Sequence, residues 1–374
     1  MIDVVALSIP AFVVLIVAEL IVDRRKGLGY YRFDAALTDL SCGVGNQVFE
    51  LFTKAALVAL YAALYEAASL WKMPQSSAAT WIFAFVAVDL LFYWWHRASH
   101  RSNVLWAVHV VHHQSEEFNL AAALRQELFN KVTQLAFYLP LALLGVPPII
   151  FATTVAISTV YMFWVHTRTI DRLGAFEWVM NTPSHHRVHH GRDPKYVDRN
   201  YGGVFIVFDR LFGTYQREEE EPVYGTVKAF HSRNPVWANF EPFVAIWELG
   251  RTFDRRLDAL KLWFMPPDWR PESAGGRFIV PDPREEARPR YKTPHSRGVG
   301  WWVIVNFVIA AAAIGALLLL EDKLSPWVIY GGGCWILWGT INWGALMEGR
   351  RWARFGEALR VVAAVGLVAI VRLS

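Results

Sequence analysis

The chain has 374 residues, of which 54% are hydrophobic and only 19% are charged. Soluble domains carry about 25% charged residues, so this composition favours a protein with both lipid-embedded and aqueous parts. The formal net charge of +4 is too small to indicate nucleic-acid binding, and two cysteines far apart in sequence exclude a disulfide scaffold.

Apolar runs of about 20 residues, the length that crosses a bilayer as a helix, recur along the chain. The first run does not resemble a cleaved signal peptide, because Asp3 stands where basic residues are expected. Residues 134–165 carry Gly145-Val146-Pro147-Pro148 at their middle, which predicts a hairpin of two short helices because proline disfavours continuous helix. We expect spans at residues 2–22, 48–70, 80–95, 300–320 and 326–346, and a weaker one at 358–373.

Residues 171–298 are rich in Arg, Asp, Glu and Pro and are predicted to form the main aqueous region, with an extended linker at 277–297. The predicted fold class is therefore all-α, a polytopic membrane helical bundle with a histidine-rich cytoplasmic cap. We expect N-terminal transmembrane helices at 1–79, a histidine-rich domain at 80–225, a cytoplasmic polar region and linker at 226–298, and C-terminal transmembrane helices at 299–374.

The distribution of basic residues predicts an orientation. The positive-inside rule places Arg24-Arg25-Lys26 in the cytoplasm. The following crossings then bring the histidine clusters, Arg168 and Arg350-Arg351 to the same side, whereas Glu321-Asp322-Lys323 lies outside. We therefore expect a multi-pass integral membrane protein whose histidines face the cytoplasm.

Most of the 12 histidines form three clusters with short spacings. The first cluster has the pattern H-x3-H, and the second and third have the pattern H-x2-HH. Because positions i, i+3 and i+4 share one face of a helix, each cluster directs two or three imidazoles toward one point. The clustered histidines are His96, His100, His109, His112, His113, His186, His189 and His190.

Eight imidazoles exceed the needs of one ion, because a zinc site takes about three or four protein ligands. Two ions with open positions fit better, although imidazole alone does not select the metal. The clusters lack cysteine, and Arg97 replaces the glutamate of the H-E-x-x-H motif. His166, at the end of an apolar segment, and His185, directly before the third cluster, are further candidate ligands, whereas His231 and His295 are expected to be ordinary polar residues.

Carboxylates near the clusters are candidates to hold the histidine rings, because a ligating histidine usually donates its second N–H to a carboxylate or carbonyl. Asp89 lies two helical turns before His96 and shares its face, but it could instead pair with a basic residue of a neighbouring helix. Glu117 and Glu127 follow the second cluster and have the same role, unless they are simply solvated.

The three clusters together resemble the signature of the fatty acid hydroxylase / sterol desaturase superfamily, over roughly residues 84–220. Within it, the runs 112–126, 181–191, 200–203 and 209–214 are similar to the alkylglycerol monooxygenase branch. The resemblance implies a membrane centre of two iron ions held by the matched histidines. It also implies oxidation of a lipid by O2, with tetrahydrobiopterin or an external electron-transfer partner as the reductant.

Two other classes of protein remain open. A membrane zinc-dependent lipid hydrolase would work without oxygen or electrons but would leave most histidines unexplained. A metal transporter would place its histidines along a path near the bilayer midplane, whereas these lie at helix ends. We therefore predict an oxidoreductase that hydroxylates, desaturates or otherwise oxidises an ether lipid, sterol, fatty-acyl chain or aminolipid, using O2 and external electrons.

Overall fold

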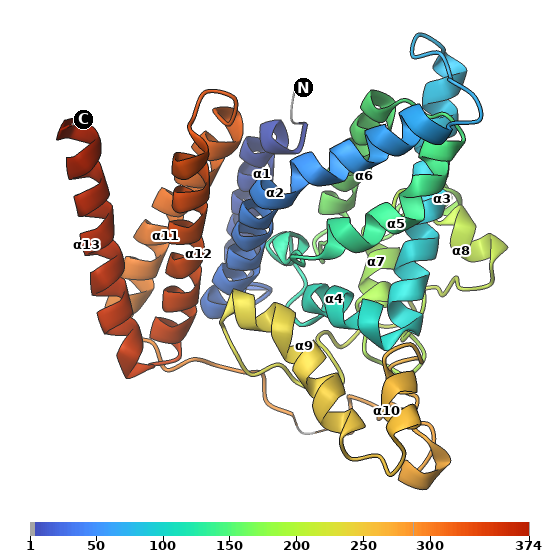
Figure 1. The fold of residues 1–374 in the computed structure, drawn as a ribbon. Helices are drawn as coiled ribbons and strands as arrows, with labels where there is room; N and C mark the ends of the chain where they lie inside the picture. Colours follow the sequence, from blue (N-terminus) through green and yellow to red (C-terminus); the bar gives the residue numbers. More distant parts are fainter. Residues whose placement is uncertain (1–3, 287, 374) are drawn as a thin grey trace.

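The computed structural model describes residues 4–286 and 288–373 and consists of helices joined by loops (Figure 1). These residues form two isolated β-bridges and no strand, so the predicted all-α class is confirmed. Residues 2 and 3, where the first predicted span begins, lie outside the described residues. The helices are α1 (Val4–Lys26), α2 (Phe33–Ala68), α3 (Ala78–Arg101), α4 (Asn103–His113), η1 (Ala122–Leu124), α5 (Asn130–Leu143), α6 (Pro148–Trp164), η2 (Gly174–Trp178), α7 (Pro183–His189), α8 (Val207–Leu211), α9 (Pro235–Gly250), α10 (Arg256–Leu262), η3 (Glu272–Ala274), α11 (Arg297–Leu319), α12 (Pro326–Met347) and α13 (Arg351–Leu373).

Within the described residues, four helices are long and apolar enough to cross a membrane, namely α1, α2, α3 and α11. They correspond to the first four predicted spans. The two C-terminal segments predicted as further spans do form the long helices α12 and α13, but neither meets the same criterion of length and apolarity. Instead α12 packs against α2, α11 and α13, and Figure 1 shows these helices side by side.

Helix α2 begins 15 residues before the predicted start at residue 48, because buried ion pairs satisfy the carboxylates of its first turns. The carboxylate of Asp39 accepts a hydrogen bond from Nη1 of Arg125 at 3.0 Å. The carboxylate of Asp34 lies 2.7 Å from Nη2 of Arg233. Both carboxylates are buried, so this polar start of α2 is helix packed against other parts of the protein rather than a solvated loop.

The predicted hairpin is formed by α5 and α6. Gly145 has φ +87°, a left-handed conformation that L side chains rarely adopt. Pro147 follows in extended conformation, and Pro148 occupies the first turn of α6, where a missing N–H costs nothing. The hairpin directs the C-terminal end of α6 toward α7, which carries the third histidine cluster.

The two largest apolar cores among the described residues hold most of the long helices together. The first joins α2, α11 and α12 and includes Val48, Val303 and the fully buried Trp343. The second joins the C-terminal part of α2 with α3, α5 and α6 and includes Tyr61 and Trp95. The helices α4, α9 and α10 lie at the lower end of this assembly in Figure 1, together with the connection between α12 and α13.

The predicted linker is extended but is not free. Residues 277–286 and 288–297, here called the strap, pass across the histidine-bearing end of the protein. Arg284 forms an ion pair with Asp193, and Nη1 of Arg290 lies 3.1 Å from the carboxylate of Glu117. Nη1 of Arg288 donates to the carbonyl of Val227 at 2.8 Å. The strap therefore joins the C-terminal helices to the histidine-rich part through charged contacts.

Replacing Gly145 with Ala should lower the thermal midpoint of the detergent-solubilised protein by at least a few degrees. The positive φ alone costs about 1–2 kcal/mol for an L residue. In addition, the new Cβ would lie 1.7 Å from the carbonyl oxygen of Trp71, so the backbone must shift. Gly174→Ala is the matched control, because Gly174 has φ +62° but open space around it. Equal losses in the two variants would contradict the role of the close contact.

Candidate metal centre

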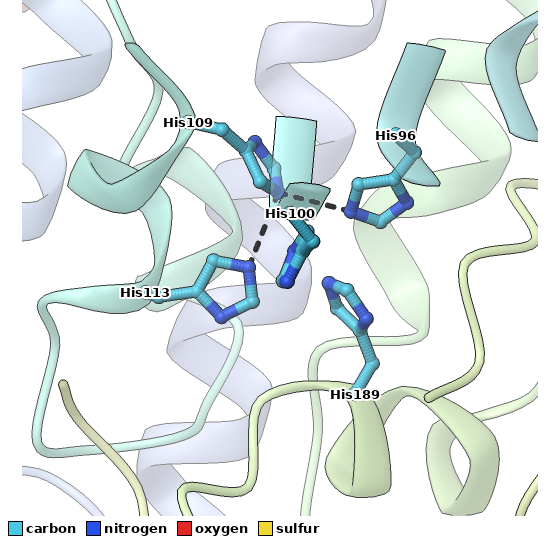
Figure 2. A group of neighbouring side chains, drawn as sticks. All are labelled: His96, His100, His109, His113 and His189. Atoms are coloured by element: carbon cyan, nitrogen blue, oxygen red, sulfur yellow. Dashed lines mark hydrogen bonds between the residues drawn. The ribbon is translucent and has the colours of Figure 1, made fainter. Parts of the chain in front are cut away.

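Five histidines from three helices converge on one point. His96 and His100 come from α3, His109 and His113 from α4, and His189 from α7. One ring nitrogen of each lies within 4.8 Å of those of the others, and all five side chains are buried. Figure 2 shows these rings directed toward one another from different elements. We call this set the first histidine group.

Four more histidines form a second histidine group under the same distance limit. His112 comes from α4, His166 follows α6, and His186 and His190 come from α7 and its C-terminal cap. The groups are in contact, because the rings of His113 and His190 stack with their centroids 4.4 Å apart. Each H-x2-HH cluster is therefore divided between the groups. The cluster on α4 contributes two histidines to the first group and one to the second, whereas the cluster at α7 contributes one to the first group and two to the second.

The hydrogen bonds of the rings determine which nitrogens carry lone pairs. Nδ1 of His96 donates to the carbonyl of Tyr201 at 2.7 Å, and Nδ1 of His109 lies 2.6 Å from a carboxylate oxygen of Glu127. These partners accept hydrogen bonds, so both rings hold their proton on Nδ1 and leave Nε2 bare. The two Nε2 atoms are nevertheless only 2.9 Å apart. Two lone pairs at this distance repel each other unless a cation lies between them.

The second group repeats this arrangement. Nδ1 of His112 donates to the carbonyl of Arg125 at 3.1 Å, and Nδ1 of His166 donates to that of Met162 at 2.8 Å. Their Nε2 atoms face each other at 3.0 Å. Two nitrogens bound at right angles to one ion, each about 2.1 Å away, lie about 3 Å apart. The donor set of each group therefore fits a bound metal ion.

The protonation state of the histidines agrees with this fit. Burial lowers the pKa of the histidines that α4, α7 and the end of α6 contribute to the two groups, and repulsion from neighbouring imidazoles adds to the effect. The pKa of His112 falls to about 4. Neutral imidazole is the form that binds metal ions. The histidines whose pKa falls well below 6.5 are His109, His113, His166, His186, His189 and His190.

Two rings of the first group have unpartnered nitrogens. Nε2 of His100 and Nε2 of His189 are buried and have no hydrogen-bond partner among the described residues. An unpaired buried acceptor is costly, so these atoms need a ligand of another kind. The other nitrogen of each ring does have a partner. Nδ1 of His100 lies 3.5 Å from Asp198, and Nδ1 of His189 donates to the carbonyl of Arg199 at 3.0 Å.

The carboxylates predicted to hold the rings are placed differently from expectation. Asp89 contacts no histidine; its two oxygens accept the backbone N–H groups of Val204 and Phe205 at 2.7 and 2.8 Å. It therefore fixes the loop whose Tyr201 carbonyl binds His96. The carboxylate of Glu117 faces Arg290 and Arg32 instead of a ring.

Glu127 is the carboxylate in closest contact with a ring, 2.6 Å from Nδ1 of His109, whereas Asp198 lies 3.5 Å from Nδ1 of His100. Sequence reasoning named Glu127 only as one of several acidic residues after the second cluster. His185 lies outside both groups, although it is buried next to His186, and its ring packs against Tyr215. His231 and His295 also lie outside them, as predicted.

A cavity of about 400 Å³ reaches the two groups from the side of the membrane helices. Its walls are mainly apolar and come from α1, α2, α5, α6 and α11. Rings of both groups contribute to its lining: His96, His109, His112, His166 and His186. A long apolar molecule can therefore reach the histidines without passing through water.

Comparisons with known proteins give a consistent result. The fatty acid hydroxylase profile matches residues 81–214. The chain is 34% identical to alkylglycerol monooxygenase of Homo sapiens over 96% of this chain and 81% of that protein, and 36% identical to that of Xenopus tropicalis over 93% and 78%. An ornithine lipid hydroxylase of Rhizobium tropici is 27% identical over 36% of this chain and 41% of that protein. No solved structure gives a significant match.

Glu127→Gln should reduce the affinity of the purified protein for metal by about 10- to 100-fold, the usual effect of losing a partner of a ligating histidine. The amide keeps the size of the side chain but loses the charge that favours the Nδ1 proton of His109. The measurement is bound metal against free metal in a competitive chelator titration. Glu117→Gln is the matched control, because Glu117 is equally buried but contacts arginines. A normal affinity in Glu127→Gln would rule out this role.

Proposed function

This chain belongs to the alkylglycerol monooxygenase branch of the fatty acid hydroxylase family, and we propose that it oxidises an ether lipid at two iron ions. It is an oxygen-dependent lipid oxidoreductase of the membrane, as predicted. Family membership therefore favours this class over the zinc-dependent hydrolase and the metal transporter.

One observation carries the proposal: two adjacent groups of buried imidazoles direct bare nitrogens at two points beside an apolar cavity. We propose that each group holds one ion. The proposed ligands of the first ion are His96, His100, His109, His113 and His189, and those of the second are His112, His166, His186 and His190. All proposed ligands are imidazoles, which suit iron among other metals. We propose iron because the chain belongs to an oxygen-dependent family of lipid hydroxylases.

Iron would supply the oxygen chemistry needed to attack a C–H bond, which no side chain performs unaided. The protein positions the lipid and keeps water away. Phe92 and Trp95 line the cavity next to the histidines and are buried, so the reacting carbon lies among apolar side chains. Hydrolysis and loss of oxidising equivalents to water are thereby suppressed.

The proposed substrate is an ether lipid of the alkylglycerol type, because relatives covering most of the chain are alkylglycerol monooxygenases. One atom of O2 enters the lipid next to the ether oxygen and the other leaves as water. Each turnover thus takes two electrons and two protons from outside. We propose tetrahydrobiopterin as the source, with an electron-transfer protein as the alternative.

We also propose that the histidine groups face the cytoplasm. The connection after α1, which follows the basic residues Arg24, Arg25 and Lys26, and the connection after α12, with Arg350 and Arg351, lie at the same end as α4 and α9 (Figure 1). The acidic turn between α11 and α12 lies at the opposite end. This distribution supports a cytoplasmic cap by the positive-inside rule.

The domain boundaries at residues 79, 225 and 298 remain part of the proposal. The segment that matches the family profile, 81–214, falls within the proposed domain at 80–225, which supports these limits.

Purified protein loaded with ferrous iron should bind about two iron ions per chain and consume O2 only when an alkylglycerol and a reductant are present. Lipid mass spectrometry should detect the aldehyde released from the ether. His112→Ala should lose iron and activity, because a ligand of the second ion is removed. His185→Ala should keep both, because His185 is buried nearby but lies outside the groups. Lipid turnover under anaerobic conditions, or with zinc in place of iron, would contradict the proposal.

A further inference from the structure

A second cavity, of about 210 Å³, adjoins the first and extends between α2, α5 and α6. It is again lined mainly by apolar side chains, among them Leu57, Tyr61 and Phe151. The two cavities share part of their lining. Together they form a path that leads from the hairpin end of α6 to the histidine groups.

The shared lining is unexpectedly polar. Lys131, Gln134 and Tyr138 of α5 face both cavities at the spacing i, i+3, i+7, which places them on one side of the helix. Gln47 and Glu50 of the adjacent helix α2 lie beside them. We call these five residues the polar ledge. Elsewhere along the path, the walls from α1 and α6 are largely apolar.

The polar ledge has open hydrogen-bonding capacity. Gln134 and Tyr138 are 7% and 4% exposed, and among the described residues neither the amide nor the hydroxyl has a hydrogen-bond partner. No carboxylate of the described residues lies within ion-pair distance of Lys131, although Glu127 interacts with it electrostatically. The Gln134 and Tyr138 side chains both line the two cavities, and polar groups that face an apolar cavity are costly unless a polar partner binds them. Their presence there favours a polar ligand.

The position of the polar ledge relates that ligand to the reaction. Oε2 of Glu127, whose other oxygen binds His109, lies 3.3 Å from Nδ2 of Asn130 at the start of α5. Lys131 follows Asn130 directly, and Gln134 is one helical turn beyond Asn130, about 6 Å along the axis. The polar ledge therefore continues along α5 from the residue that contacts the partner of His109.

The chemistry of the side chains indicates the class of head group. The amides of Gln47 and Gln134 and the hydroxyl of Tyr138 both donate and accept hydrogen bonds, as the hydroxyl groups of a polyol do. Lys131 and Glu50 carry opposite formal charges, so the five residues of the polar ledge have no net formal charge. A quaternary ammonium head would instead require a cage of aromatic rings.

We infer that the polar ledge binds the uncharged, hydroxyl-bearing head group of the lipid substrate and makes the enzyme selective for it. The inference rests on the proposed function for the identity of the site, and it extends that proposal to the residues that distinguish one lipid from another. The apolar wall opposite, which includes Ile9, Phe12 and Val13 of α1, takes the alkyl chain. The first carbons of the chain then lie next to the histidines.

The test compares three ether lipids with the same alkyl chain: one with a free glycerol head, one with both hydroxyls methylated, and one with a phosphate on the head group. Their equilibrium binding to the full-length protein in nanodiscs is measured by quenching of tryptophan fluorescence, and kcat and KM are measured on the iron-loaded protein. Gln134→Met and Tyr138→Phe remove hydrogen-bonding groups with little change in volume. Thr153→Val is the matched control, because Thr153 lines only the second cavity, and its hydroxyl binds the backbone of Ile149.

The wild-type protein should bind the glycerol lipid at least about tenfold more tightly than the methylated one, the effect of one or two hydrogen bonds. Gln134→Met should abolish most of this preference, Tyr138→Phe should reduce it, and Thr153→Val should leave it unchanged. In turnover, KM for the glycerol lipid should rise while kcat stays within about twofold. A merely structural role would weaken the binding of both lipids equally.

The inference is overturned if the variants keep the wild-type preference, or if the phosphate lipid binds most tightly. The outcome for the proposed function is separate. A wild-type protein that binds the glycerol lipid selectively but oxidises none of the three lipids would support the binding role of the polar ledge and contradict the oxygenase proposal. Oxidation of all three lipids with equal efficiency would support the oxygenase and contradict the polar ledge.

Discussion

The convergence of nine buried imidazoles on two points is the constraint on which the rest of the structure depends. Their bare nitrogens face one another at about the separation of two ligands on one ion, so the arrangement is unfavourable without positive charge at its centre. Such an arrangement persists only if other contacts hold every ring in place. The histidines come from α3, α4, the end of α6, and α7, and these elements must therefore pack in one fixed relation.

Backbone groups provide much of this support. The carbonyl of Tyr201 that binds His96 belongs to a loop held by two buried carboxylates. Asp89 accepts the N–H groups of residues 204 and 205, and Asp209 accepts those of residues 201 and 202, both at 2.7 Å. The loop begins with Asp198 and Asn200, whose positive φ angles Asp and Asn adopt more readily than most residues. A buried carboxylate that is not itself bonded to the His96 ring thus sets the direction of that ring through an intervening carbonyl.

Nine of the ten histidines predicted to meet do so, whereas His185 lies outside, and the sequence did not show how the nine divide between two groups. Spacings of three and four residues place His109, His112 and His113 on one side of a helix, and that local rule holds in α4. Their division between two groups depends on how α7 packs against α4, which no local pattern records. For the same reason the partners of the rings were hard to predict. Most are backbone carbonyls, which every residue possesses. Of the carboxylates, Glu127 is separated from His109 by a loop and a 3-10 turn, and Asp198 is distant in sequence from His100.

The helix boundaries show a related limit. Hydropathy located the apolar helices but missed the polar beginning of α2, because the carboxylates of Asp34 and Asp39 look solvated until Arg233 and Arg125 are found beside them. These arginines are distant in sequence. Pairing over such distances is decided by tertiary packing and cannot be read from the composition of a segment.

The two sides of the centre are built from different physical interactions. Toward the cap, the strap and its ion pairs close the protein over the histidine end with arginines whose charges are compensated by Asp193 and Glu117. Toward the membrane, the cavity is lined by alkyl and aromatic side chains, and the polar ledge interrupts them. The alkyl chain of a lipid that enters from the bilayer therefore stays in an apolar environment, and only the head group forms hydrogen bonds with the protein. Selectivity in such a site must come from the polar ledge, because an apolar wall distinguishes chains by little more than their volume.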